Sequence, residues 1–534
     1  MYAVRRRALT ALCAVVAFAA SASAADARVV PAGKPLDWRA CQEAPGWECA
    51  EASVPKVYDG HAGTFTLAVT RLPATDQQHK IGSLFINYGG PGASAVDITQ
   101  AIGEVLFAPF RDRFDIVAFD PRGTGATSRA IDCRANQETE GPYSQPFFEP
   151  HDDLGAYLQR IKGYFAECRK AYRGVVRYTT TGNYARDMNQ LRKSLREQRL
   201  NYFGFSYGTF IGETFAAMFP HRFRAMVLDG ALDPDQYINR PMSGLRVQTA
   251  GFEKAFGRFM MTCAATQEFC SFGGDDPWLA FDKLVDQANT SPIPAGGTDP
   301  RPVDGDDILA GSFGVLYSKF AWTDLAIALN QLAAGDGTLM RQLADDFYGR
   351  EEDGTYSPGT DRYLALSAEQ RYPDDPETYV DACEESWAAF DHAWWNAGCV
   401  ELYWRALPNR VYGAYYGPWR VPNSASTPLV IGTRYDPATP YRGAKRAVQR
   451  MGNARLLTMN GDGHTAFFNG SDCIDAYVVS YVIDLQQPPE NAQCDQDVPF
   501  PLPPEPSATA KAKAKASVEH RYAGPRTAPV VPRR

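Results

Sequence analysis

Short runs of β-branched and aromatic residues recur along this chain, and each run ends at a turn signal. They are FTLAVTRL, SLFINYGGPG, FDIVAFDPRGTG, LNYFGFSYG, AMVLDGALDP, TPLVIGTRYD and ARLLTMNGDGH. Runs that are apolar at nearly every position suit strands buried on both faces of a parallel sheet. Helical patterns lie between several of them, for example at residues 183–199 and 208–220. This alternation predicts an α/β fold, with a mostly parallel central sheet flanked by helices.

The strand pattern fades over residues 235–426, where the sequence becomes helical and rich in aromatic residues. We therefore expect a core in two parts, residues 25–234 and 427–498, with a large, mainly helical cap domain inserted between them. Residues 499–534 are rich in Pro, Ala and Lys and follow neither a strand nor a helix period. Such a composition predicts a disordered tail.

The first 24 residues have the layout of a cleaved secretory signal, with three arginines, a short apolar run and small residues around Ala24. A membrane anchor or a buried first helix is the alternative interpretation. The apolar run is too short to span a bilayer, and no other stretch of the sequence is long and apolar enough to cross a membrane. We therefore expect a secreted, periplasmic or envelope protein without a membrane span.

Removal of that signal leaves ten of the eleven cysteines, and these fall in near neighbours along the chain. The neighbours are Cys41 with Cys49, Cys133 with Cys168, Cys263 with Cys270, Cys383 with Cys399, and Cys473 with Cys494. An even count in an oxidising compartment predicts local disulfides, although spacing alone does not fix the connectivity. Because no C-x-x-C pair or Cys/His cluster with zinc spacing occurs in the sequence, we expect no metal site.

The formal net charge of the chain is −8, and the tail carries an excess of basic residues, so the body is more acidic than the whole. An acidic body argues against nucleic acid as a partner. The basic tail is a candidate for weak association with an anionic envelope surface, and a solvated extension without function is the alternative.

Ser206 lies in the pattern G-x-S-x-G, after a predicted strand and before a predicted helix. A strand-to-helix turn at this point forces the serine into a strained backbone geometry and exposes its hydroxyl. Gly204 and Gly208 leave room for the chain to double back. We therefore interpret Ser206 as a nucleophile, which requires a base to share its proton.

His464 is the best placed of the histidines to act as that base, because it follows a predicted strand in the loop NGDGHTAF. Asp436 follows the preceding strand and is the preferred acid, which would hold the imidazole in the right tautomer. Asp462 is a rival by proximity, and Asp229 and Asp233 are the more serious alternatives because they follow an earlier strand.

The segment NYGGPGAS follows another predicted strand and offers backbone N–H groups for an oxyanion hole. We assign the N–H of Gly90 and that of Tyr207, the residue next to the nucleophile. A tight turn without catalytic role is the alternative interpretation of the glycines.

Together, NYGGPGAS, FDPRGTG, LNYFGFSYGTFIG, MVLDG, DPATP and GDGH resemble the exported α/β-hydrolase peptidases of the tripeptidyl aminopeptidase type, relatives of proline iminopeptidase. The resemblance runs from about Trp38 to Cys494. Proline iminopeptidases usually read His-Gly-Gly-Pro-Gly where this chain has Asn87 and Tyr88 before its glycines. The resemblance implies an α/β-hydrolase fold and release of short peptides, tripeptides above all, from a peptide or small protein with a free N-terminus. It also implies that no metal or organic cofactor takes part.

An enzyme of this kind needs a carboxylate to meet the substrate's α-ammonium group, since an unpaired charge in a closed pocket is costly. In YVDACEESW, Glu385 matches the acidic stretch of the tripeptidyl group more closely than Glu384 does. The alternative is an exposed acidic pair near a helix start. For the whole chain, an esterase or amidase of the same fold is the second hypothesis, and a noncatalytic envelope-binding protein is the third.

Overall fold

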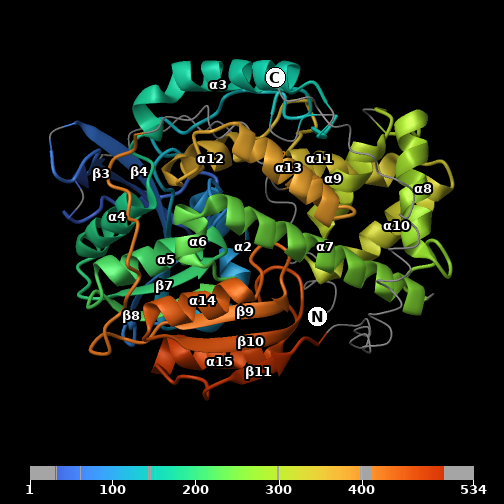
Figure 1. Cartoon of the computed structure of the whole chain (residues 1–534). Coiled ribbons are helices and arrows are strands. Elements are labelled where there is room, and N and C mark those ends of the chain that lie inside the picture. The colour runs from blue at the N-terminus through green and yellow to red at the C-terminus, as the bar shows by residue number, and fades with distance from the viewer. Residues whose placement is uncertain are drawn as a thin grey trace.

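The computed structural model of the chain describes residues 30–497, except positions 32, 61, 142–143, 145, 151, 267, 298–299, 397–398 and 400–409. The predicted signal (1–24) and the predicted tail (499–534) lie outside these residues. The described strands form a single sheet (Figure 1). Their bounds are β1 Val30–Pro31, β2 Arg39–Ala40, β3 Glu48–Pro55, β4 Thr64–Leu72, β5 Gly82–Asn87, β6 Phe114–Phe119, β7 Leu200–Phe205, β8 Phe223–Asp229, β9 Leu429–Tyr435, β10 Arg455–Asp462 and β11 Ala492–Asp495.

The strands lie in the order β1-β3-β4-β6-β5-β7-β8-β9-β10-β11, with β2 paired to β3 beside this path. From β6 to β11 every neighbouring pair is parallel. β4 is antiparallel to both β3 and β6, so the N-terminal end of the sheet is mixed. The central strands are buried at almost every position, and β7 is buried at all of them. Their continuous apolar sequences therefore reflect burial on both faces of the sheet.

Helices cover both faces of this sheet. The helices of the core are α2 Ala95–Leu106, α4 Thr181–Ser194, α5 Tyr207–Met218, α14 Arg442–Met451 and α15 Asp472–Asp484. Side chains of α4, α5 and α14 belong to the hydrophobic cluster on one face, whereas the other cluster contains side chains of α15 and of the turn that follows α2. The α/β fold and each of the seven strands expected from the apolar runs are confirmed.

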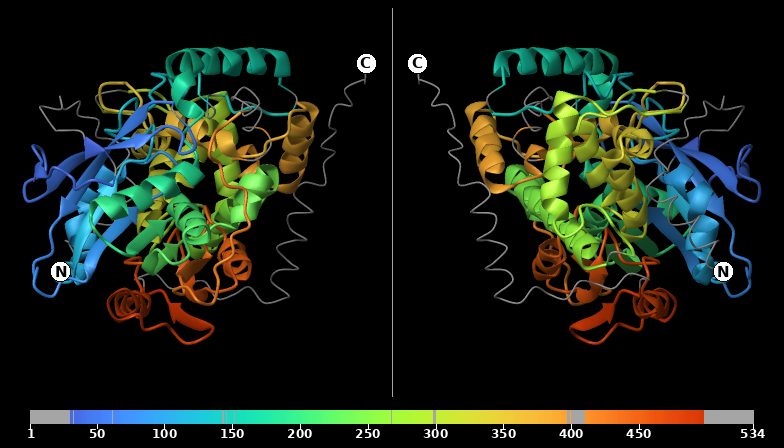
Figure 2. Two further views of the ribbon diagram at one scale, coloured as in Figure 1. Left: turned by 90° about the vertical axis from the view of Figure 1, so that its left-hand side faces the viewer. Right: turned by 90° about the vertical axis from the view of Figure 1, so that its right-hand side faces the viewer.

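The remaining described α-helices lie outside the five core helices, and we use the name cap for them. Their bounds are α3 Leu154–Val176, α6 Pro234–Asn239, α7 Pro241–Ala265, α8 Pro277–Thr290, α9 Gly305–Val315, α10 Trp322–Ala333, α11 Thr338–Tyr348, α12 Gly359–Leu366 and α13 Glu377–Ala389. Ile238 of α6 and Leu366 of α12 nevertheless pack in the core cluster. Figure 1 shows α7 to α11 gathered at one side of the core. In both views of Figure 2, α3 lies at one end of the molecule, and α15 and β11 lie at the opposite end.

Packing crosses the expected domain bounds at several places. Tyr157, Ile161 and Phe165 of α3 belong to the hydrophobic cluster of the cap, although α3 precedes residue 235. Conversely, Trp419 and Val421 precede residue 427 and pack in the core cluster beside α5. The hydrophobic cluster of the cap therefore includes side chains from outside the predicted insertion.

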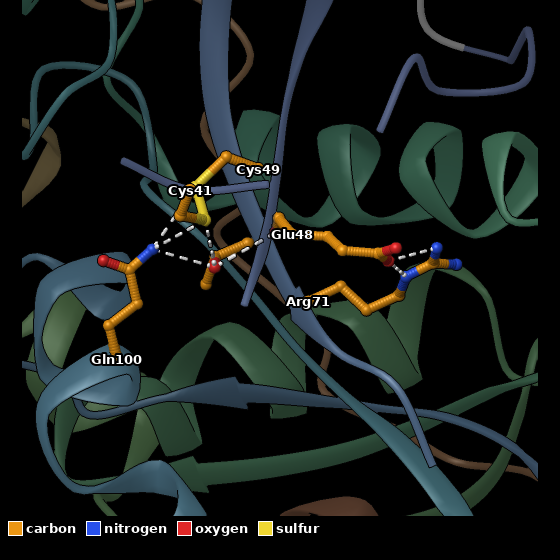
Figure 3. Close-up of a disulfide and its surroundings, with 6 residues drawn as sticks. Cys41, Glu48, Cys49, Arg71 and Gln100 are labelled. Atoms are coloured by element: carbon orange, nitrogen blue, oxygen red, sulfur yellow. Dashed lines mark hydrogen bonds and ion pairs between the residues drawn. A yellow bond between two sulfur atoms is a disulfide. The ribbon is translucent and has the colours of Figure 1, made fainter. Parts of the chain in front are cut away.

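All five local disulfides expected from the cysteine neighbours are present. Figure 3 shows Cys41–Cys49, where the side chain of Gln100 donates to both sulfur atoms at 3.5 and 3.4 Å. The Arg71–Glu48 ion pair lies beside this disulfide and joins β4 to β3. These links tie the short N-terminal strands to α2 and to the sheet.

No helix among the described residues is long and apolar enough to cross a membrane. Within the same residues, no group of three or more His, Cys, Asp or Glu side chains is arranged to hold a metal ion.

Candidate active site

The strands from β5 to β10 that run parallel end at the same edge of the sheet, and the residues of interest follow these ends. Ser206 follows β7, Asp229 ends β8, Asp436 follows β9 and His464 lies two residues after β10. Ligands of open α/β sheets bind outside the carboxyl ends of the strands. This edge is therefore where the fold would place a reacting group.

Ser206 stands at a sharp turn between β7 and α5. Its φ of 55° and ψ of −128° lie in a region that residues with side chains rarely adopt, as a nucleophile elbow requires. Its N–H donates to the carbonyl of Asp229 at 2.9 Å, which anchors the turn to the next strand. A Cβ on Gly204 would lie 2.5 Å from the carbonyl oxygen of Gly208, so the turn requires glycine there.

His464 and Asp436 form a hydrogen-bonded pair. Nδ1 of His464 lies 2.9 Å from each carboxylate oxygen of Asp436. An ionised carboxylate only accepts, so Nδ1 carries the hydrogen and Nε2 is left as the basic nitrogen. The Asp436 side chain is fully buried and that of His464 is 12% exposed. Burial lowers the pKa of His464, but the charge and the hydrogen bond of Asp436 outweigh it and leave that pKa raised.

The Asp436 carboxylate is held by further donors from its own turn. The backbone N–H groups of Ala438 and Thr439 donate to Oδ1 at 2.9 and 2.8 Å. The Thr439 hydroxyl donates to Oδ2 at 2.8 Å and lies 3.2 Å from Nδ1 of His464. Because these bonds fix the carboxylate, they also fix the orientation of the imidazole.

The three rival carboxylates have other partners. Asp229 accepts the backbone N–H groups of Ala466 and Phe467, and burial raises the pKa of Asp229 to about 7. Asp233 pairs with Arg450. Asp462 is buried and paired with cations of the cap. Among the described residues, Asp436 is the one of these acids that hydrogen-bonds the His464 ring.

The glycine loop after β5 packs against the elbow. A Cβ on Gly89 would lie 2.8 Å from the nitrogen of Tyr207 and 3.0 Å from Cβ of Ser206, so the two backbones touch. The N–H of Gly89 is occupied by the Asn87 side chain at 3.0 Å. Within the described part of the chain, the N–H groups of Gly90 and Tyr207 have no such partner. They are therefore available for a developing negative charge.

Comparisons with known proteins agree with this geometry. Residues 82–264 match the family described as alpha/beta hydrolase fold, and residues 411–494 match the family described as TAP-like protein. The chain is 33% identical to serine protease Hip1 of Mycobacterium tuberculosis, over 86% of this chain and 91% of that protein. The chain belongs to the TAP-like α/β hydrolases.

Other relatives of this hydrolase carry different names. It is 33% identical to carboxylesterase B of M. tuberculosis, over 84% of this chain and 86% of that protein. It is 27% identical to the tripeptidyl aminopeptidase of Streptomyces lividans, over 89% of each chain. These relatives make the protein a serine hydrolase, and they support a serine peptidase of the α/β-hydrolase type.

Glu384 and Glu385 of the hydrolase lie on the exposed side of α13. The Glu385 carboxylate forms an ion pair with Arg246 of α7, and both side chains are at least half exposed. The buried Cys383 beside them is joined to Cys399 as expected. The nearby residues Trp394 and Trp395 are buried in the hydrophobic cluster of the cap.

Sequence reasoning missed three contributors to this site. Thr439 could have been found, because DPATP places a hydroxyl three residues after the acid, a spacing that suits a side-chain to side-chain contact within one turn. The role of Asp229 as an acceptor for the loop after His464 has no local signal, since its partners lie more than 230 residues away. Tyr317 of the cap, whose carbonyl accepts the His464 N–H at 2.7 Å, is equally remote in sequence.

Proposed function

We propose that this protein is an exported serine exopeptidase that releases short peptides, tripeptides above all, from free N-termini. Ser206 is its nucleophile, His464 its general base and acid, and Asp436 the carboxylate that orients the histidine. The observation that carries the proposal is the Asp436–His464 pair, which follows two neighbouring strands at the edge where Ser206 stands.

The reaction follows from these groups. Ser206 Oγ attacks the scissile carbonyl while Nε2 of His464 takes its proton. The carbonyl oxygen becomes negative and is stabilised by the N–H groups of Gly90 and Tyr207. His464 then gives the proton to the leaving amine, which departs and leaves an acyl-enzyme. A water molecule, activated by His464 in the same way, releases the acyl peptide and restores the serine.

The substrate class is proposed from the relatives, one of which is named tripeptidyl aminopeptidase. A free α-ammonium group would require a carboxylate, for which Glu385 is our first candidate and Glu384 the second. Because Arg246 already pairs with Glu385, the substrate amine would have to share or replace that partner. No metal or organic cofactor is required by the proposed steps.

Export is proposed from the predicted signal peptide, with cleavage near Ala24. Five disulfides are compatible with an extracellular or envelope location, because such bonds persist in oxidising compartments. The basic tail is proposed to favour weak association with the envelope.

A panel of chromogenic amides tests the proposal. It contains mono-, di- and tripeptidyl groups on one leaving group, each with a free and with an acetylated N-terminus. We expect fastest turnover of the free tripeptidyl substrate and a large loss on acetylation. Equal turnover of free and acetylated substrates would contradict an aminopeptidase.

An esterase or amidase acting on small molecules is the second candidate. A relative named carboxylesterase B is 33% identical to this chain, the same identity as serine protease Hip1. Such an esterase would use the same three side chains. The panel separates the two, because an esterase would cleave simple p-nitrophenyl esters without any need for a free α-amine.

A further inference from the structure

Tyr317 lies where the cap meets the loop of the proposed catalytic base. It follows α9 in the chain and its ring packs edge-on against the His464 imidazole, with the centroids 5.5 Å apart and the planes at 84°. The ring also lies 5.5 Å, centroid to centroid, from that of Phe252 in α7. A residue of the cap thus contacts the imidazole directly.

The position of Tyr317 is fixed by its neighbours. Its carbonyl accepts the backbone N–H of His464 at 2.7 Å. Two residues on, Nζ of Lys319 donates to the Asp462 carboxylate at 2.7 Å, and both side chains are fully buried. A Cβ on Gly463 would come within 3.1 Å of the Tyr317 carbonyl oxygen, so the two segments are in close contact. The backbone of Tyr317 is therefore tied to the His464 loop, which brings its ring close to the imidazole.

The Tyr317 residue is nevertheless partly open to solvent. The residue is 37% exposed, although its ring contacts both Phe252 and His464. Five large apolar residues of the described chain are exposed in this way, namely Val105, Leu279, Tyr317, Ile327 and Leu485. Tyr317 is the member of this set that contacts the proposed triad. An exposed aromatic surface gains free energy when an apolar group covers it.

We propose that Tyr317 forms the apolar wall of the subsite for the residue that follows the scissile bond. This inference rests on the proposed peptidase function. In a serine peptidase the histidine passes its proton to the leaving amine, so the leaving chain must lie on the histidine's side of the site. The first side chain of that leaving chain then lies within reach of the ring beside His464. The preferred side chain is large and apolar or aromatic, as in Leu or Phe.

The test uses peptides with a free N-terminus that share all residues up to the scissile bond and have Gly, Ala, Leu or Phe after it. Cleavage sites are read by mass spectrometry and kcat/KM is measured for each peptide. We expect the wild-type protein to prefer Phe over Gly by about tenfold, the scale of a partly buried aromatic side chain. Tyr317→Ala should reduce this ratio to within about twofold of unity, whereas Tyr317→Phe should keep it.

The ratio separates recognition from damage to the fold, because a displaced His464 would slow the Gly and Phe peptides alike. Ile327→Ala is the matched control, since Ile327 is an exposed apolar residue of cap helix α10 and should leave the ratio unchanged. The inference is overturned if Tyr317→Ala keeps the wild-type ratio, if the wild type shows no preference, or if Tyr317→Phe loses the ratio as Tyr317→Ala does. If the wild type cleaves esters but none of the peptides, the peptidase function fails and this inference falls with it.

Discussion

Asp436 and Asp229 are buried carboxylates at neighbouring strand ends, and their partners give them different roles. Asp436 contacts the His464 ring, whereas Asp229 accepts backbone N–H groups of the loop that follows it. Asp436→Asn should lower kcat by about 10⁴-fold, the scale seen when the orienting carboxylate of a triad is lost. Asp229→Asn is the matched control. It should lower the stability of the fold but reduce kcat far less than Asp436→Asn does. A much larger loss of kcat in Asp229→Asn than in Asp436→Asn would identify Asp229, at the end of the earlier strand, as the acid.

The same pair predicts the pH dependence of kcat/KM. His464 must be neutral to act as base, and its pKa is raised above the ordinary 6.5 by Asp436 despite burial. Activity should therefore fall as the pH drops through a midpoint above 6.5. In Asp436→Asn the residual activity should have a lower midpoint, because burial is then opposed only by the weaker effect of the Asp229 charge. An unchanged midpoint in Asp436→Asn would contradict the conclusion that Asp436 raises the pKa of His464.

Glu385 tests how the substrate's amine is recognised. If its carboxylate meets the α-ammonium group, Glu385→Gln should raise KM for free-amine peptides about tenfold or more and leave p-nitrophenyl acetate hydrolysis nearly untouched. Glu377→Gln, on an exposed position of the same helix, is the control and should change neither. Equal losses on both substrates, or none on either, would remove Glu385 from the amine site.

At the scale of elements, the junction between cap and core depends on a buried cluster of charges. Asp462 at the end of β10 accepts from Arg258 of α7 and from Lys319, and all three side chains are at most 5% exposed. Asp462→Asn would leave two buried cations without a counter-charge, which should cost about 3–5 kcal/mol in the free energy of unfolding. Lys319→Met leaves the Arg258–Asp462 pair intact and should cost much less.

Thermal unfolding of the two variants checks this ranking, with kcat measured alongside. Because Asp462 lies two residues before His464, Asp462→Asn should also lower kcat for the peptide substrates. A Lys319→Met variant less stable than Asp462→Asn would contradict the proposed charge balance.

At the scale of the whole molecule, local disulfides cross-link the chain in both the core and the cap. Peptide mapping under non-reducing conditions should recover the five pairs, and reduction should lower the melting temperature, because each cross-link restricts the unfolded chain. Free thiols at these cysteines in protein isolated from its natural compartment would contradict both the pairing and the proposed export.

Features that depend on residues close together in the sequence could be predicted, whereas contacts between distant segments could not. Strands such as β7 and the turn at Ser206 are specified by adjacent residues, so apolar runs and glycines were sufficient to locate them. The serine, the acid and the histidine each follow a predicted strand, which placed them at one edge of a parallel sheet. Contacts between distant segments left no such pattern. α3 joins the hydrophobic cluster of helices that lie after residue 235, and Glu385 meets Arg246 across a separation of 139 residues.

Ser206 as the nucleophile is the central claim, and covalent labelling tests it most directly. The protein is treated with a fluorophosphonate, digested and mapped by mass spectrometry, with Ser206→Ala as the paired sample. We predict a single adduct on Ser206 in the wild type and none in Ser206→Ala, whose fold should be retained and whose kcat should be about 10⁶-fold lower, the scale of losing a triad serine. An adduct on another serine, or wild-type turnover by Ser206→Ala, would contradict the account.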